Sequence, residues 1–313
     1  MTSSHPRLAL KVDCDTFEGT QKGIPQLLRL FDKASIRATF FFTLGPDTSG
    51  RAVMRVFTRK GFLRKMLRSN AVALYGPKTM LYGTLLPAPM IGEKCSEVIR
   101  SVAAAGHEVG IHGWDHVRWH DRLDRMSEDQ ITRDVERAHG VFTQIFEKKA
   151  HAVAAPGWHV TPAYLQIQDA YRLLYASNTR GGSPCFLEAD GVRFKTLEIP
   201  STLPTWDEVL GTPEDQNEAA FIDYFRKQIR QTEVHSIHTE VEGRAYSGRF
   251  ERQLDAWQAD GVQFVTLEEV ANEVLADRSR IPVRRHVRIA IPNRAGFVSS
   301  GAPSTRAGDL PSS

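Results

Sequence analysis

The sequence predicts an α/β protein, a (β/α) barrel of about seven strands whose active site lies at the carboxyl ends of the strands. Short apolar segments alternate with segments of helical period along most of the 313 residues, the pattern of parallel strands joined by helices. Unusual polar residues repeatedly follow the apolar segments. They come from strands spread over the whole chain, which favours a barrel over an open sheet.

The first half of the chain begins with an apolar strand that runs into two aspartates. The helix after it has a proline in its first turn, and a later helix stops at a glycine. Apolar composition predicts the strands. In chain order, the expected elements are a strand at 8–12, a helix at 24–31, a strand at 37–44, a helix at 93–105 and a strand at 107–111.

The second half continues the alternation, beginning with a long helix that a capping box at Ser127 starts and that runs to Phe146. The later strands are expected at 151–155, 173–176, 194–199, 234–237 and 263–266, before a last helix at 267–276. From residue 277 on, the sequence is rich in Arg, Pro, Gly and Ser and has no period. We therefore expect a barrel over 1–276, with a basic amphipathic insertion at about 51–92, and a basic flexible tail over 277–313.

Composition and charge limit the kinds of partner. The net charge of +3 is too small to indicate nucleic acid. No run reaches the roughly 18 apolar residues that a membrane-spanning helix requires. The first residues lack an apolar signal region, which predicts a cytoplasmic location. The three cysteines (Cys14, Cys95 and Cys185) are widely spaced, which favours a reducing compartment over a disulfide framework.

The insertion begins with a strongly basic stretch. Seven of the eighteen residues from 51 to 68 are basic and none is acidic, and bulky apolar residues interleave with them. A helix of this kind can lie in the interface of an anionic bilayer or pair with a lipid phosphate. A solvated helix packed on the barrel is the alternative. The residues assigned to lipid phosphate or membrane are Arg55, Arg59, Lys60, Arg64, Lys65 and Arg68.

Two histidines and two aspartates predict a metal site. His112 and His116 are four residues apart, so a helical turn places their imidazoles on one side, where they can converge on one ion. Asp13 and Asp15 follow the first strand. One of them can bind a divalent ion while the other stays free as a base. Three protein ligands of this mixed oxygen and nitrogen kind leave a position open for water.

These motifs resemble the NodB-type polysaccharide deacetylase family over roughly residues 8–275. The resemblance is carried by the Asp-x-Asp motif, by the His-x-x-x-His motif after Gly-His-Glu-Val-Gly, and by Ile237-His238. Within the family the chain is most similar to the branch that deformylates 4-deoxy-4-formamido-L-arabinose on undecaprenyl phosphate. The strings that carry this finer similarity are Gly45–Asp47, Lys65–Ala71, Leu203–Val209 and Ile237–Gly243.

The resemblance implies a distorted barrel and a role for each motif residue. Asp15, His112 and His116 bind the metal, Asp13 is the general base and His238 is the general acid. Zinc is the ion that the family implies, and manganese, cobalt and iron suit the same ligands. An exchange of roles between the two aspartates remains open. His235 is the rival of His238 as the acid.

The resemblance also implies a substrate and a place of action. The products would be formate and an aminoarabinose lipid used in lipid A modification and cationic peptide (polymyxin) resistance. The enzyme would work as a peripheral protein on the cytoplasmic face of the inner membrane. The residues assigned to the substrate are Trp158, His159, Arg180, Trp206 and Asp207, with a core position as the alternative for the tryptophans.

Two positions depart from the wider family. An arginine that holds the base aspartate is common where this chain has Ala154, and we expect His159 or Arg180 to fill that space. Asn178 stands where an aspartate would orient the acid histidine. Two alternatives to the deformylase remain: a deacetylase of another N-acylated sugar, and a non-catalytic barrel that binds anionic lipid.

Overall fold

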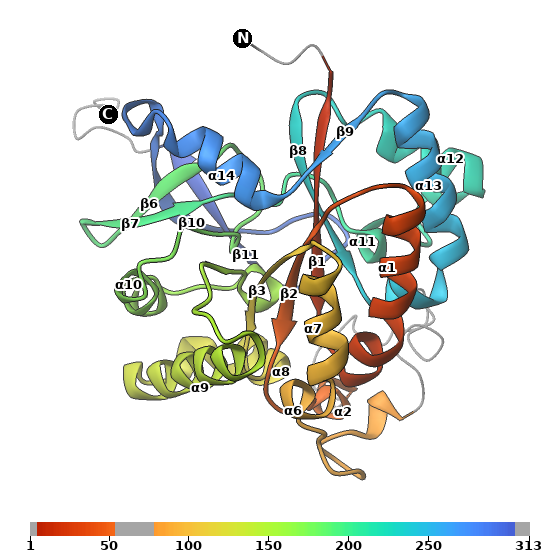
Figure 1. Cartoon of the computed structure of the whole chain (residues 1–313). Helices are drawn as coiled ribbons and strands as arrows, with labels where there is room; N and C mark the ends of the chain where they lie inside the picture. The colour runs from red at the N-terminus through yellow and green to blue at the C-terminus, as the bar shows by residue number, and fades with distance from the viewer. Residues whose placement is uncertain (1–4, 54–77, 304–313) are drawn as a thin grey trace.

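The structure, a computed structural model, describes residues 5–53 and 78–303 (Figure 1). Its strands are β1 (Arg7–Cys14), β2 (Thr39–Thr43), β3 (Glu108–Gly113), β4 (Ala152–Val153), β5 (Tyr175–Ala176), β6 (Cys185–Ala189), β7 (Val192–Glu198), β8 (Thr232–His238), β9 (Gln263–Val265), β10 (Val283–Ile289) and β11 (Val298–Pro303). Its α-helices are α1 (Ile24–Lys33), α2 (Ser49–Val53), α6 (Ile91–Lys94), α7 (Ser96–Ala104), α8 (His116–Arg122), α9 (Glu128–Phe146), α10 (Pro162–Ala170), α11 (Trp206–Val209), α12 (Glu218–Arg226), α13 (Ser247–Ala259) and α14 (Leu267–Leu275).

Parallel strands form most of a barrel in the order β8-β1-β2-β3-β4-β5-β7. The segment after β7 turns back to β8, where the amides of Thr202 and Leu203 donate to the carbonyl of Val234 at 2.9 and 3.2 Å. The predicted barrel of about seven strands is thereby confirmed. It is distorted, because β4 and β5 have two residues each and this short contact replaces a full strand pair.

The strand β1 pairs with three other strands, β2, β8 and β9. One of its edges pairs with β8 from Arg7 to Asp13, while its other edge pairs with β9 over its first residues and with β2 over its last. Because successive side chains of a strand point to opposite faces, Leu8, Leu10 and Val12 pack in the large core beneath the outer helices. The intervening residues, which include Asp13, lie on the inner face of the barrel.

The outer helices cover β1, β2 and β8 on one side (Figure 1). Phe31 of α1, Val102 of α7 and Trp257 of α13 are buried in a single core with the outward side chains of these strands. Burying a side chain of this size stabilises the fold by about 1.5–3 kcal/mol. The core thus fixes the direction of β1, and with it the position of the residues that follow the strand.

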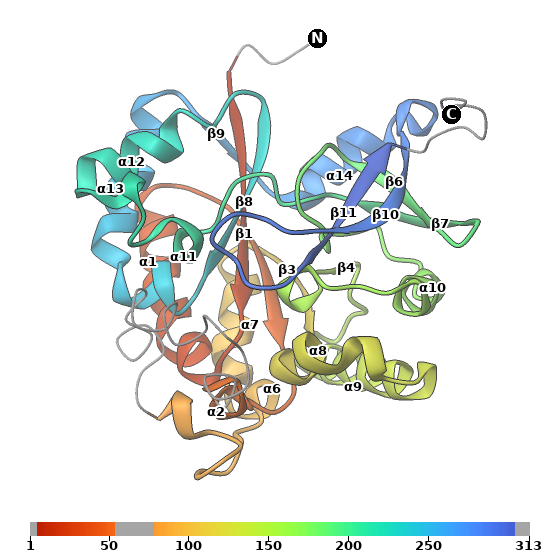
Figure 2. The same ribbon diagram turned by 180° about the vertical axis from the view of Figure 1, so that it is seen from behind.

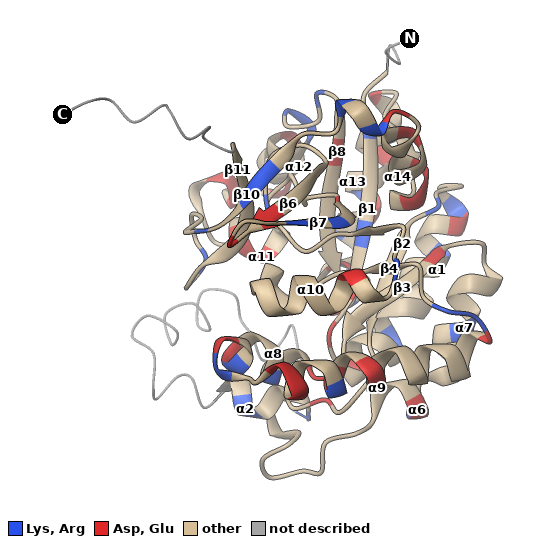
Figure 3. Ribbon diagram, turned by 90° about the vertical axis from the view of Figure 1, so that its left-hand side faces the viewer, with Lys and Arg blue, Asp and Glu red and all other residues tan. Residues whose placement is uncertain are grey.

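The C-terminal segment differs from the expected flexible tail. β10 pairs with β6, and β11 pairs with β10 as an antiparallel neighbour, so that residues 283–303 extend the sheet beyond β7. The arginines of β10 concealed the strand period, because no residue of this strand is fully buried and a partly exposed strand tolerates charge. Figure 3 shows the basic stretch. On β11, Val298 and Ser299 are buried. Residues 304–313 lie outside the described part of the chain.

The expected basic insertion is described only at its ends. The amide of Gly50 donates to the carbonyl of Tyr82 at 2.9 Å, and Arg51 Nε donates to the carbonyl of Gly83 at 3.1 Å. The two described ends of the insertion therefore lie side by side. Among the helices that the structure describes, none is long and apolar enough to cross a bilayer. The basic residues assigned to lipid lie outside the described residues: Arg55, Arg59, Lys60, Arg64, Lys65 and Arg68.

Candidate active site and metal centre

Three strand ends bring the predicted catalytic residues together. Asp13 and Asp15 lie at the end of β1. His112 is the next-to-last residue of β3, and His116 is the first residue of α8. His238 ends β8 and is the register partner of Asp13. Since neighbouring parallel strands end at the same edge, residues distant in sequence meet at one place.

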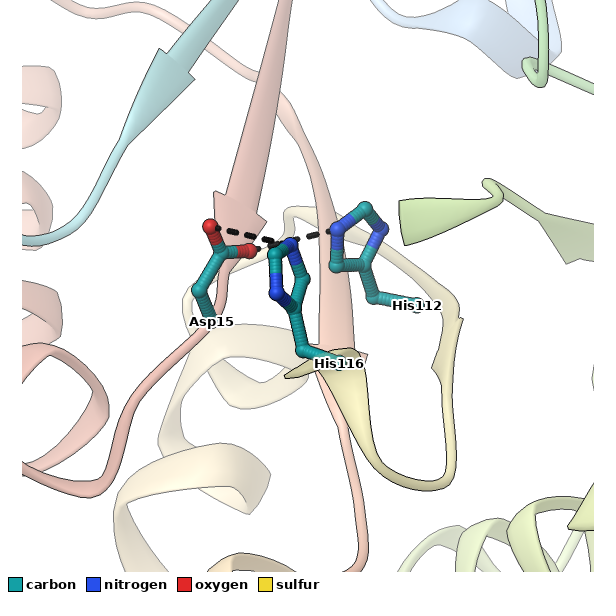
Figure 4. A group of neighbouring side chains, drawn as sticks. All are labelled: Asp15, His112 and His116. Carbon is teal, nitrogen blue, oxygen red and sulfur yellow. Dashed lines mark ion pairs between the residues drawn. The ribbon is translucent and has the colours of Figure 1, made fainter. Parts of the chain in front are cut away.

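The metal-ligand candidates face one another (Figure 4). Asp15 Oδ1 lies 3.2 Å from His112 Nε2, and Asp15 Oδ2 lies 3.4 Å from His116 Nε2. All three offer ligand atoms within 4.8 Å of one another. Asp115 caps α8 by accepting from the amide of Arg118 at 2.9 Å, which fixes the turn that carries His116.

The arrangement fits a divalent cation. The side-chain oxygens Asp13 Oδ1 and Asp15 Oδ1 are buried and have no hydrogen bond in the described structure. Burial opposes the effect, but the imidazoles of His116 and His112 hold the pKa of Asp15 below its ordinary value. A carboxylate with two imidazole nitrogens converging on one point is a ligand set for zinc and similar ions.

A second group of metal-ligand types, Glu108, His151 and Glu268, is different. Glu108 Oε1 accepts from the Tyr175 hydroxyl at 2.6 Å and faces His151 Nε2 at 3.2 Å. Glu108 Oε2 accepts from the Thr39 hydroxyl at 2.6 Å and from the Glu268 amide at 2.9 Å. Both carboxylate oxygens are therefore engaged by protein donors, and this group is a hydrogen-bonded part of the fold.

Asp13, the expected base, lies beside a buried lysine. Lys11 Nζ is 3.2 Å from Asp13 Oδ2, and the lysine side chain is 0% exposed. Asp13 Oδ1 faces the metal-ligand group, 3.7 Å from His112 Nδ1. Burial lowers the pKa of Lys11, and the Asp13 carboxylate opposes that shift. One oxygen of Asp13 is thus held by a cation while the other points toward the reaction site.

Lys11 also corrects the expectation about Ala154. His159 faces Asp124 at 2.9 Å, and Arg180 makes two hydrogen bonds to Glu208, so neither supplies a cation to Asp13. Lys11 does so from the same strand as the aspartate. The sequence signal for this contact was the alternation of side chains along a strand, because residues two apart share a face.

His238 has the surroundings of a proton donor. Its amide donates to Glu242 Oε2 at 2.8 Å. Burial lowers the pKa of the imidazole, but the charges of Asp15, Asp207 and Glu242 outweigh this and raise it to about 9. Asn178 takes no part, since its side chain accepts from the Ala155 amide and donates to Gln168.

His235, the rival of His238, is a core residue. It is 0% exposed and packs against the rings of Phe225 and Trp257, with centroids 5.1 and 5.7 Å away. Burial lowers its pKa to about 3. A histidine that stays neutral in the folded state makes folding sensitive to acid, because the unfolded chain takes up the proton first.

We therefore expect His235→Leu to weaken the loss of stability in mild acid. Below the unfolded pKa of 6.5 and down to about 3, only the unfolded wild-type chain protonates at this position, so the free energy of unfolding falls as the pH falls. Between pH 7 and pH 5 this amounts to about 2 kcal/mol. Urea unfolding at both pH values measures it, and an equal fall in both proteins would contradict the expectation.

The residues assigned to the substrate divide into two groups. Trp206 is 0% exposed and packs on Phe221 and Phe250, so its assignment to sugar binding is wrong and it belongs to the core. His159 lies with Asp124 away from Asp13 and the metal ligands. The others remain near the site: Trp158 contacts Lys11, Arg180 contacts Trp158, and the charge of Asp207 acts on His238.

The structure shows a contact near the site that the sequence analysis did not predict. Glu240 Oε1 accepts from the Thr16 amide at 2.9 Å and from the Thr16 hydroxyl at 2.5 Å, tying the turn after β8 to the turn after β1. Gly23 permits this contact, because a Cβ there would lie 2.1 Å from the carbonyl oxygen of Thr239. The bond between the turns steadies Asp15, which immediately precedes Thr16.

Comparisons with known proteins agree with this geometry. The family model of the polysaccharide deacetylases matches residues 3–176. The chain is 34% identical over 301 residues to a protein of Shewanella sediminis named probable 4-deoxy-4-formamido-L-arabinose-phosphoundecaprenol deformylase, with 95% of each covered. A protein of the same name from Wigglesworthia glossinidia brevipalpis is 31% identical, over 90% of this chain and 97% of that protein.

A solved structure shows the likeness of fold. The crystal structure of a probable polysaccharide deacetylase from Pseudomonas aeruginosa PAO1 matches with a TM-score of 0.60 at 16% identity, covering 87% of this chain and 91% of that one. The match covers 87% of this chain, so the shared fold extends beyond residues 3–176, which the family model matches.

Proposed function

Because the chain belongs to the polysaccharide deacetylase family, we propose that it hydrolyses the formamide of 4-deoxy-4-formamido-L-arabinose carried on undecaprenyl phosphate. The products are formate and the amino sugar lipid, which serves lipid A modification and resistance to cationic peptides. The observation that carries the chemistry is the meeting of Asp13, His238 and the group of Asp15, His112 and His116 at one edge of the sheet. The names of the two relatives support the substrate.

In this proposal Asp15, His112 and His116 hold one divalent ion, zinc by the family resemblance, with manganese, cobalt and iron suited to the same donors. When bound, such an ion lowers the pKa of a water toward about 7 and polarises the carbonyl. Asp13 takes the proton from the attacking water. Lys11 holds Asp13 in place, because its Nζ lies 3.2 Å from Asp13 Oδ2 in a buried position.

His238 completes the reaction. As the bond between the formyl carbon and the nitrogen breaks, the imidazole gives its proton to the departing amine. His238 on β8 is the register partner of Asp13 on β1, so the acid and the base lie side by side on neighbouring strands. We further propose that the protein works as a peripheral enzyme on the cytoplasmic face of the inner membrane, where the basic segment of residues 51–68 meets anionic lipid.

Formate release from the formamido-arabinose prenyl phosphate tests the proposal. We expect formate from the protein supplied with a divalent metal and none after a chelator. The acetamido form of the same sugar lipid is the comparison substrate and is expected to react more slowly. If the protein binds metal and releases acetate from the acetamido substrate but no formate from the formamido substrate, its function is deacetylation instead. Absence of metal binding would overturn the catalytic proposal.

A further inference from the structure

The loop between β10 and β11, residues 290–297, reaches from the added strands toward α11 (Figure 2). Arg294 is the charged residue of this loop, and its neighbours at 292, 293 and 295–297 are exposed. Its own side chain turns inward and is 14% exposed. Asn293 and Gly296 have left-handed backbone conformations, with φ of 61° and 86°, which reverse the loop on either side of it.

Arg294 packs close to the residues that hold the expected base. Its Cζ is 4.8 Å from the centre of the Trp158 ring. The same ring lies 5.1 Å from Lys11 Nζ, and Lys11 in turn holds Asp13. The Arg294 guanidinium and the lysine that holds the base therefore contact the same aromatic ring.

Three cations surround Trp158, but only two of them have a counter-ion at hydrogen-bond distance. Lys11 pairs with Asp13. Arg180 binds both oxygens of Glu208, at 2.9 and 3.0 Å. Arg294 Nη1 is 3.7 Å from Glu208 Oε1, an oxygen that Arg180 already engages. In residues 5–53 and 78–303 no acceptor takes a hydrogen bond from the Arg294 guanidinium.

The backbone beneath makes room for this arginine. A Cβ at Gly157 would lie 3.3 Å from Arg294 Nη2 and 2.5 Å from His120, and the glycine has a φ of 63°. Turning a charged side chain inward without an acceptor costs free energy. Arg294 therefore has donors that make no hydrogen bond within the described residues, its ion pair with Glu208 is long at 3.7 Å, and Gly157 leaves space beside it. Together these features suit an anion.

We propose that Arg294 binds the phosphate of the substrate, the phosphodiester that joins the sugar to its lipid. This inference rests on the proposed function, which supplies a phosphate one sugar ring away from the reacting formamide. The planar guanidinium can donate two parallel hydrogen bonds to phosphate oxygens. Trp158, a side chain about the size of a sugar ring, contacts both Arg294 and Lys11, the residue that holds the base.

Arg294→Gln tests the assignment, with Arg285→Gln as the matched control. Arg285 is an exposed arginine of β10 opposite Ala302 and does not contact Trp158. Each protein is assayed on the formamido-arabinose prenyl phosphodiester and on the phosphate-free methyl glycoside of the same sugar. We expect Arg294→Gln to raise the KM for the phosphodiester about tenfold to a hundredfold. We expect the methyl glycoside to be unaffected, and Arg285→Gln to leave both substrates unaffected.

Two results would overturn the assignment: an equal loss on both substrates, which would indicate a structural role, or no loss on either. Calorimetric binding of a short prenyl phosphate and of inorganic phosphate to the metal-loaded proteins separates this inference from the proposed function, because it needs no turnover. Weaker binding of both probes by Arg294→Gln alone supports the subsite even if no formate is released. Equal binding by wild type and variant rejects it even if formate appears.

Discussion

Replacing His112 by alanine is expected to abolish metal binding and to lower formate release by about a thousandfold. The imidazole is almost fully buried, and its Nε2 lies 3.2 Å from Asp15, so no other side chain can take its place without moving β3. Bound metal, measured by elemental analysis of the purified protein, and formate release are the two readouts.

His139→Ala is the matched control, because His139 lies on α9, stacks on Tyr171 and is not part of the metal-ligand group. It should keep both the metal and the activity. Full metal content in His112→Ala would remove this histidine from the ligand set. Loss of metal in the control variant as well would indicate a general effect on folding.

Asp13→Asn is expected to lower kcat by about a hundredfold to ten-thousandfold while the metal stays bound. Asparagine has nearly the same shape but cannot take a proton from water. The metal group does not include Asp13, whose oxygens face Lys11 and His112 Nδ1. Asp15→Asn is the companion variant and should lose the metal.

The pair of variants decides the exchange of roles that the sequence leaves open. If Asp13→Asn loses the metal and Asp15→Asn keeps it, the base and the ligand are reversed. If both keep the metal and both keep their activity, neither aspartate has the proposed role. Metal content and kcat are measured on the same protein samples. A loss of activity with the metal still bound can then be distinguished from a loss caused by missing metal.

The barrel could be predicted because its strands are apolar segments with clear ends. β1, β3 and β8 lie where the sequence places them, since each carries apolar residues that pack in the core, such as Leu10, Ile111 and Ile237. β10 and β11 could not be predicted, because β10 is only partly buried and tolerates arginine, while β11 lies at the edge of the sheet and tolerates serine. Their pairing depends on partners far away in the chain.

The meeting of Asp15, His112 and His116 could be predicted from the Asp-x-Asp and His-x-x-x-His motifs. The expected helical turn was wrong, because His112 lies on β3 and only His116 lies on a helix. Lys11 and Arg294 could not be predicted. A lysine and an arginine usually lie on the surface, and only the packed structure shows that these two turn inward. Trp206 was expected to bind the sugar but is buried in the core, because an indole ring suits a core as well as a sugar-binding site.

The position of β1 between β2 and β8 has a consequence for how the cell makes this protein. Synthesis proceeds from the N-terminus, at about 5–20 residues per second, and β8 leaves the ribosome long after β1. During that time the nascent chain carries β1 with one edge open, and such edges invite aggregation. Asp13 and His238 can meet only after most of the chain has emerged, so we expect chaperone protection during translation to limit the yield of active enzyme.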